Sequence, residues 1–105
     1  MGTKKLSPKE AFYFFTSVGN FTGRIAVSLE DFLKEIRDVD AKSLEFHLHR
    51  QDFEKWIIDV LKDPKLAKEI QNLRNQKLTG KALWNSLYSI ILKNLRLQEL
   101  TRKNS

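Results

Sequence analysis

The chain contains two histidines, His47 and His49, which are one residue apart and lie close to several carboxylates. Imidazole nitrogens bind metal ions and transfer protons near neutral pH, so this segment has the clearest potential for chemistry. On a β-strand the two side chains would project from the same side and could share one metal ion. On an α-helix they would lie about 200° apart around the axis and could not. The secondary structure of residues 43–56 therefore decides which chemistry is open to them.

The sequence around the histidines predicts two successive helices. Asp40 or Ser43 can cap the first, and Asp52 begins a second in which Phe53 and Trp56 keep helical spacing. A strand here would leave its backbone groups unpaired, because no convincing partner strand is evident elsewhere in the sequence. We therefore expect the two imidazoles to diverge.

The helical arrangement leaves two interpretations of the histidine segment open. It places Glu45, His49 and Asp52 near one another, which is typical of a weak metal or acid–base cluster. A zinc site, however, needs three or four convergent ligands. The alternative is a histidine that pairs with a carboxylate at a helix junction, and we favour it. We predict no catalytic residue, no metal ion and no cofactor.

Other signatures of enzymes are missing from the sequence. It has no cysteine, no serine at a strand-to-helix elbow, and no glycine-rich loop with the spacing of a phosphate-binding motif. We expect a non-enzymatic protein without a small-molecule substrate.

Length and composition are typical of one ordered domain. The chain has 105 residues, of which 41% are hydrophobic and 30% charged, with two prolines and four glycines. We predict a single domain over residues 1–105. The lack of cysteine fits a reducing compartment, and the sequence shows neither a signal segment nor an apolar run of about 20 residues. We expect a cytoplasmic protein that does not bind a membrane.

The N-terminal segment is predicted to form a helix and then a loop. Residues 7–10, Ser-Pro-Lys-Glu, combine a capping box with proline at the first helical position. Gly19 supplies a stop signal. The helical spacing of apolar residues is kept by Ala11, Phe14, Phe15 and Val18. This pattern predicts a helix over residues 8–18 and a loop over residues 19–27.

Capping residues and apolar stripes predict further helices from Ser28 onward. Ser28 and Asp63 are typical N-caps, and Asp63 is followed by Pro64. The last helix is the longest, and its broad apolar arc suggests packing on more than one side. We therefore predict an all-α fold, a single compact domain of five or six helices that is bundle-like. Residues 1–6 and 101–105 are expected to fray.

Several phrases of the sequence are similar to those of a known family. They are Ser28-Leu29-Glu30-Asp31-Phe32, Ser43-Leu44-Glu45-Phe46-His47-Leu48-His49-Arg50, Asp52-Phe53-Glu54-Lys55-Trp56 and Asp63 to Ile70, preceded by Phe14-Phe15 and Thr22-Gly23. Over about residues 10–75 the chain resembles a family of small, mainly archaeal helical domains with no assigned function. The resemblance implies a helical fold, and it implies no activity or catalytic residue.

Positive charge is concentrated at the C-terminal end. Residues 30–63 carry six Lys or Arg and ten Asp or Glu, whereas residues 64–105 carry nine and two, a net charge of +7. Three of these cations, Lys93, Arg96 and Lys103, fall opposite the apolar stripe of the last helix. The charge predicts salt-sensitive, sequence-tolerant binding of nucleic acid or another polyanion. The candidate residues are Lys65, Lys68, Arg74, Lys77, Lys81, Lys93, Arg96, Arg102 and Lys103. A solvated helix face is the competing interpretation.

An alternative function is protein–protein assembly, either as an adaptor or as a homo-oligomer. Exposed apolar or aromatic side chains would form the interface if no neighbour within the chain covers them. The candidates are Phe12, Tyr13, Trp84, Tyr88, Ile90 and Leu92. The acidic middle and the basic end of two copies could also attract each other.

Overall fold

The computed structural model describes residues 5–104, with side chains up to Thr101. The described chain forms five helices and one two-stranded antiparallel sheet. In chain order the elements are β1 (Phe12–Ser17), β2 (Asn20–Ala26), α1 (Leu29–Asp38), α2 (Ala41–His49), α3 (Asp52–Asp59), α4 (Pro64–Asn75) and α5 (Gly80–Asn104). The predicted all-α fold is therefore wrong, because the N-terminal segment is a β-hairpin that packs on the helices.

The predicted helix over residues 8–18 is replaced by one turn and strand β1. Ser7 N and Ser7 Oγ both donate to Glu10 Oε1, at 3.3 and 3.1 Å, so the helix-start signal forms a turn. The chain then becomes extended, which sends alternate side chains to opposite faces. Phe12 and Phe14 point into the core and are 4% and 0% exposed. Alternation, and not helical spacing, governs the burial of this segment.

The predicted loop over residues 19–27 contains strand β2. Val18 and Gly19 form the two-residue turn between the paired residues Ser17 and Asn20. Gly19 has a φ of +79°, a backbone conformation that glycine adopts without steric cost. The turn therefore closes a hairpin.

Strand β2 carries a bulge of residues 22–24 opposite Phe14. Thr22 Oγ1 donates to the carbonyl oxygen of Phe14 at 2.7 Å and accepts from the backbone N–H of Arg24 at 3.1 Å. The hydroxyl thus serves two backbone groups within the bulge. Gly23, at the centre of the bulge, has a φ of +87°.

The helices predicted from Ser28 onward are confirmed. Ser28 Oγ accepts from the backbone N–H of Asp31 and caps α1, and Asp40 caps α2 through the N–H of Lys42. Helix α3 follows α2 after a sharp turn at Gln51, whose φ is +66°. The two helices of the histidine segment are therefore present, with the turn between them.

Helices α4 and α5 also match their predicted patterns. Asp63 caps α4 through the N–H of Leu66, and Pro64 occupies the first turn. The predicted inward residues of α4 are all buried: Leu66, Ala67, Ile70 and Leu73. Along α5 the buried residues are Leu83, Leu87, Ile91 and Asn94. Asn94 is polar, and its amide donates to Ile90 O and Glu69 Oε2, each at 2.8 Å.

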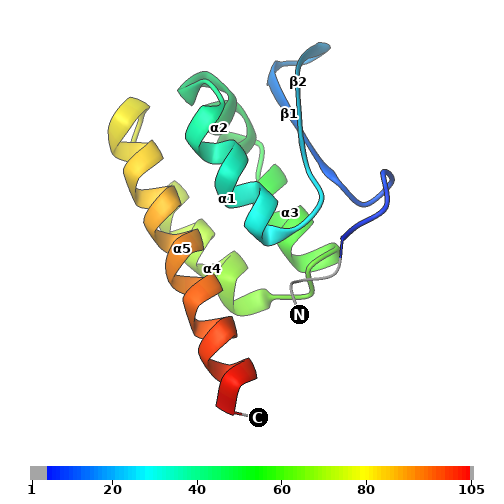
Figure 1. The fold of residues 1–105 in the computed structure, drawn as a ribbon. Helices are drawn as coiled ribbons and strands as arrows, with labels where there is room; N and C mark the ends of the chain where they lie inside the picture. Colours follow the sequence, from blue (N-terminus) through cyan, green and yellow to red (C-terminus); the bar gives the residue numbers. More distant parts are fainter. Residues whose placement is uncertain (1–4, 105) are drawn as a thin grey trace.

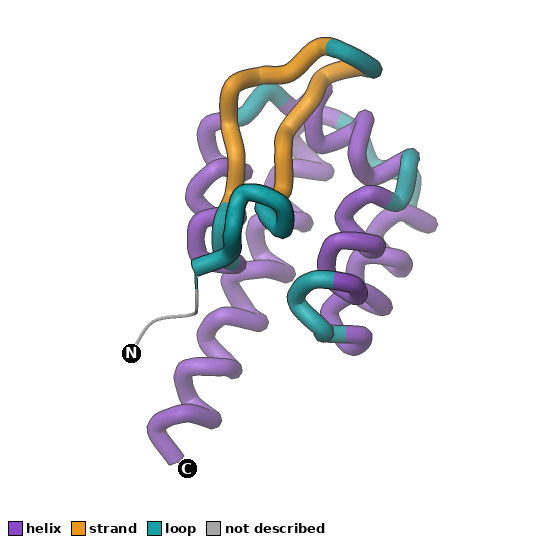
Figure 2. Tube along the Cα trace, turned by 90° about the vertical axis from the view of Figure 1, so that its right-hand side faces the viewer, coloured by secondary structure: helices purple, strands orange, loops and turns teal. Residues whose placement is uncertain are grey.

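The elements form three layers. The hairpin packs on α1 and α2, and α5 packs on the other side of these helices with α4 beside it (Figure 1). A view turned by 90° shows the hairpin in front of the helices (Figure 2). One hydrophobic core takes residues from all seven elements. Its hairpin end is aromatic and contains Phe12, Phe14, Phe32, Phe53 and Trp56.

Two further expectations concern the ends of the chain and membranes. Residue Leu6, expected to fray, donates its N–H to Val27 O at 2.7 Å, and residues 1–4 lie outside the described part. Helix α5 continues through residues 101–104. Within the described chain, every helix is too short or too polar to cross a bilayer.

Candidate functional site

Helices α4 and α5 lie side by side and run in opposite directions. Glu69 in the first half of α4 contacts Lys93 and Asn94 in the second half of α5. Leu73, near the end of α4, lines a cleft with Asn85, near the start of α5. Their apolar stripes are buried. We call the exposed polar side chains of the two helices the α4–α5 face, which includes Lys65, Lys68, Lys81, Asn85, Ser89 and Arg96.

The predicted polyanion-binding residues divide into three groups. Five are exposed and make no ion pair within the described chain: Lys65, Lys68, Lys77, Lys81 and Arg96. Arg74 and Lys93 are paired with carboxylates. The side chains of Arg102 and Lys103 lie outside those that the structure describes.

The two paired cations are held by acids of α3 and α4. Arg74 Nε donates to Glu54 Oε1 at 2.8 Å, and this hydrogen bond raises the pKa of Arg74. Lys93 Nζ donates to Glu69 Oε1. Burial acts to raise the pKa of Glu69, but hydrogen bonds from Lys93 and Asn94 outweigh it and hold that pKa below its ordinary value. Arg74 and Lys93 are therefore partly neutralised.

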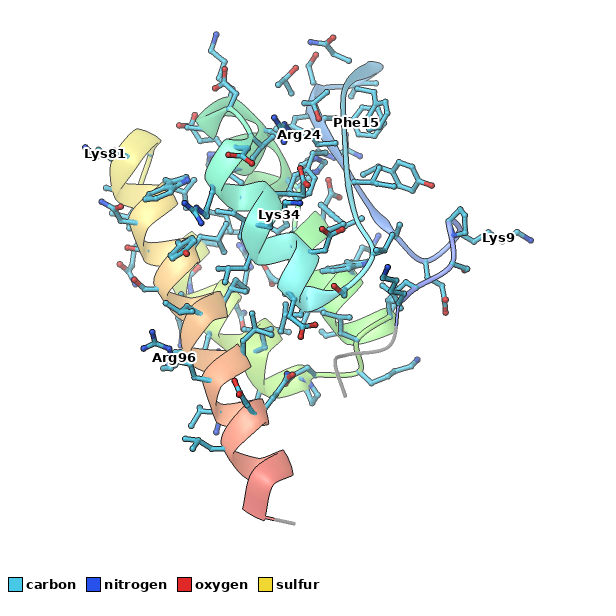
Figure 3. The ribbon with its side chains drawn as sticks, in the orientation of Figure 1. Lys9, Phe15, Arg24, Lys34, Lys81 and Arg96 are labelled. Carbon is cyan, nitrogen blue, oxygen red and sulfur yellow. The ribbon has the colours of Figure 1, made fainter. Side chains whose placement is uncertain are left out.

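The two exposed cations of α5 that make no ion pair within the described chain, Lys81 and Arg96, lie on one side of the helix. Lys81 and Arg96 are about 60° apart around the axis and about 22 Å apart along it, given 3.6 residues per turn and a rise of 1.5 Å. Figure 3 shows both side chains on the side of α5 that faces away from the hairpin. Asn85 and Ser89 lie between them and are exposed. The same side also carries the half-buried Leu92 and the exposed acid Glu99, so it combines two cations with neutral polar, apolar and acidic residues.

An open cleft of about 370 Å³ separates α4 from α5 within this face. Its lining is mostly amide and hydroxyl side chains, which donate and accept hydrogen bonds without adding charge. The lining residues are Leu73, Gln76, Asn85, Ser86, Ser89 and Ile90. The α4–α5 face thus combines spaced cations with neutral polar groups, the side-chain types that contact phosphates and sugars.

The histidine segment holds a second cluster of polar groups. His47 is buried at the junction of α2 and α3, and its Nδ1 lies 2.8 Å from Asp52 Oδ2. Its Nε2 accepts the backbone N–H of Phe15 in β1, also at 2.8 Å. Since a backbone N–H can only donate, Nε2 is unprotonated and Nδ1 carries the proton given to Asp52. His47 is thus a neutral link between the hairpin and the helices.

Burial lowers the pKa of His47 below its ordinary value, although the hydrogen bond and the charge of Asp52 act to raise it. The desolvation effect prevails because the ring is enclosed by aromatic side chains of both layers. The neighbouring rings belong to Phe12, Phe14, Phe15, Phe46 and Phe53.

Glu45, His49 and Asp52 do not form the metal or acid–base cluster that was left open. Glu45 Oε2 accepts the N–H of Gly80 and caps α5, and His49 is exposed. Asp52 binds His47 instead. Among the described residues, no group of three or more histidines and carboxylates is arranged to hold a metal ion. The histidine that pairs with a carboxylate at the helix junction is His47.

The predicted interface residues are partly used within the chain. Phe12 lies in the core, and the Nε1 of Trp84 donates to Ile36 O at 2.8 Å while its ring stacks on Tyr88. Tyr88, Ile90 and Leu92 are half-buried, and Tyr13 is exposed.

The outer face of the hairpin exposes apolar residues that sequence reasoning assigned to a helix or a loop. Val18 and Phe21 are 81% and 46% exposed, and Ile25 is also exposed. The rings of Tyr13 and Phe15 pack against Phe21 on this face. The signal that could have revealed it is the run of aromatic residues from Phe12 to Phe15, a composition typical of strands, followed by a turn at Gly19.

Comparison of the chain with protein-family models, curated proteins and solved structures found no match. The resemblance to archaeal helical domains stays a prediction, and function is inferred from the geometry alone.

Proposed function

We propose that this protein is a small non-enzymatic binding module that holds nucleic acid, or another polyanion, through the α4–α5 face. The observation that carries the proposal is the grouping of exposed cations and neutral polar side chains on two adjacent helices. Lys81 and Arg96, about 22 Å apart along α5 at 1.5 Å per residue, can contact separate phosphates of one backbone. The lack of cysteine leads us to place this activity in the cytoplasm.

Charge distribution supports this face over the others. The acidic middle of the sequence forms α1 to α3, whereas the basic residues of 64–105 lie on α4 and α5 and, for Lys77, in the loop between them. Glu69, an acid of this face, is already bound to Lys93 and Asn94. A polyanion approaching α4 and α5 therefore meets net positive charge.

The test is a salt titration of binding to a short fluorescent DNA duplex, followed by anisotropy. We expect the logarithm of the association constant to fall linearly with the logarithm of salt concentration, because phosphate contacts release counterions. The double variant Lys81→Gln, Arg96→Gln should lower the slope by about 2, since each lost contact removes about 0.9.

The matched control is Lys34→Gln, Lys55→Gln, which removes the same charge from exposed residues of α1 and α3. It should leave the slope nearly unchanged. Absence of binding at low salt, or an equal loss in the control variant, would rule out the α4–α5 face.

One observation favours the alternative of a protein adaptor or homo-oligomer. The outer face of the hairpin exposes a cluster of apolar side chains, including Phe21. Sedimentation equilibrium at several protein concentrations tests self-assembly. A mass that rises with concentration in the native chain, and not in Phe21→Ser, supports it, and a constant monomer mass excludes it.

A further inference from the structure

A groove of about 380 Å³ lies between strand β1 and the junction of α2 and α3. Volumes of this order are typical of sites for small molecules. It belongs to the hairpin side of the molecule, whereas the α4–α5 face lies on the opposite side of α1 and α2 (Figure 1). The two sites are therefore spatially independent.

Aromatic and aliphatic side chains form most of the groove wall. They come from the hairpin, from the end of α2 and from α3, and they include Tyr13, Phe15, Phe46 and Trp56. The polar ends of two of them are already occupied. Tyr13 OH donates to Pro8 O at 2.7 Å, and Trp56 Nε1 donates to Glu10 O at 2.8 Å. These residues therefore offer a ligand mainly apolar ring surface.

Two of the polar residues in the wall are committed to each other. His47 uses one ring nitrogen for Asp52 and the other for the backbone of Phe15. Asp52 Oδ2 lies 2.8 Å from His47 Nδ1 and 3.3 Å from Arg50 Nε. Neither His47 nor this carboxylate oxygen is free to bind a ligand.

Arg50 is the one cation among the lining residues. Its side chain is 52% exposed, and its guanidinium carbon lies 5.0 Å from the centre of the Phe46 ring. Asp52 and Phe46 fix the guanidinium from one edge and one face, which orients it in advance. Within the described chain, Arg50 contacts Asp52 through Nε, and its terminal Nη1 and Nη2 groups form no hydrogen bond. That edge has the fork geometry that binds carboxylate or phosphate through two parallel hydrogen bonds.

We propose that this groove binds a small molecule that consists of a flat apolar ring system and one anionic group. The ring packs against Tyr13, Phe15 and Phe46, and the carboxylate or phosphate accepts hydrogen bonds from the terminal nitrogens of Arg50. The groove adds a ligand site to the proposed polyanion-binding function and does not depend on it.

The experiment uses the full chain and three probes that share one ring: 1-naphthaleneacetate, 1-naphthyl phosphate and the neutral 1-naphthaleneacetamide. Titrations are followed by amide proton–nitrogen NMR spectra, with the Phe15 amide as the reporter because it lies beside the groove. Both anions should bind, and the amide should bind at least about tenfold more weakly, since it lacks the charge-assisted hydrogen bonds. The relative affinities of the two anions indicate whether the natural group is a carboxylate or a phosphate.

Variants of Arg50 separate charge from geometry. Arg50→Gln should lower the affinity for the anions by about tenfold and leave the affinity for the neutral amide unchanged. Arg50→Lys should have an intermediate affinity for the anions, because lysine keeps the charge but lacks the forked pair of donors. The control Arg37→Gln removes an exposed guanidinium from α1 and should change nothing. An unchanged Phe15 amide signal in the unbound variants shows that the His47 link is intact.

Three results would overturn the proposal. The first is that the anions and the neutral amide bind with equal affinity. The second is that the anions bind Arg50→Gln as tightly as the native chain. The third is that chemical-shift changes map outside the groove, or that none occur up to millimolar concentrations of the probes.

Discussion

His47 has a structural role that depends on its charge state. Its unprotonated Nε2 is the acceptor for the N–H of Phe15, and protonation would turn that nitrogen into a donor. The hydrogen bond between the hairpin and α2 is therefore available only to the neutral ring. Because burial lowers its pKa in the folded chain, the unfolded chain takes up a proton first as the pH falls.

This linkage predicts a loss of stability in mild acid. The contribution of His47 is complete above the pKa of about 6.5 of an unfolded histidine and declines as the pH falls toward the lower folded-state pKa. In that window the free energy of unfolding should fall by up to about 1.4 kcal/mol per pH unit, the slope for one proton. Urea unfolding curves at a series of pH values measure it.

Two glutamine variants test the assignment to His47. In His47→Gln, the free energy of unfolding should lose most of its pH dependence at pH values above those at which carboxylates titrate. His49→Gln alters an exposed ring on the same helix and should keep that pH dependence. If His47→Gln retained the full slope, another group would be responsible.

The sequence allowed part of this residue-scale picture to be predicted. The helix junction and the pairing of a histidine with a carboxylate follow from capping residues and helical spacing. The identity of the histidine does not, because Phe15 is 32 residues away and belongs to a strand that was predicted as helix. The partner Asp52 is five residues from His47 and lies across the turn at Gln51, outside regular helical spacing.

At the scale of elements, the end of α3 depends on a residue in an unfavourable conformation. Lys62 has a φ of +58°, and the following N–H of Asp63 donates to Ile57 O at 3.1 Å. This bond spans six residues, one more than in a Schellman motif, but Lys62 takes the left-handed position that glycine normally occupies just after the end of a helix.

We predict that Lys62→Gly stabilises the protein by about 0.5–1 kcal/mol, because glycine adopts this conformation without the steric cost of a Cβ. Lys55→Gly, the same exchange in the middle of α3, should instead destabilise it by about 1 kcal/mol. Chemical unfolding measures both. Similar destabilisation by the two variants would contradict the role given to the backbone at Lys62.

Elements with a long apolar stripe were predicted correctly, and the hairpin was not. The apolar residues of α4 have the spacing of a helix that packs on one side, and all four are buried: Leu66, Ala67, Ile70 and Leu73. In the N-terminal segment, the capping signal from Ser7 to Glu10 and the spacing of the phenylalanines are compatible with a helix as well as with a strand. Val18 would lie on that helical stripe, yet it is at the tip of the hairpin. The choice is made by tertiary packing, since Phe12 and Phe14 both reach the aromatic core only from an extended chain.

At the scale of the whole molecule, the hairpin is part of the cooperative core. Phe14 is completely buried, 4.9 Å from the ring of Phe12 and 5.6 Å from that of Phe32 between ring centres. Phe14→Ala should therefore lower the free energy of unfolding by about 3–5 kcal/mol, the usual range for a buried phenylalanine. Equilibrium unfolding in urea measures the loss.

Phe21→Ala is the control for this prediction, because it removes the same ring from the outer face of the same hairpin. Its cost should be clearly smaller, about 1 kcal/mol, since nearly half of the residue is exposed to solvent. If the two variants cost the same, the hairpin would be an appendage to the helices and not a layer of the fold.

The hydrogen bond from Phe15 to His47 also affects how molecules meet one another. The N–H of Phe15 points away from β2, so it lies on the open edge of a two-stranded sheet. Open edges invite strands of other chains to add, and this is a common route to aggregation. Because the imidazole already accepts this N–H, the edge is a poorer template for intermolecular pairing. In acid, protonation of Nε2 removes the acceptor, and the N–H of Phe15 becomes available to another strand. The same ring that fastens the hairpin therefore helps to keep concentrated protein dispersed.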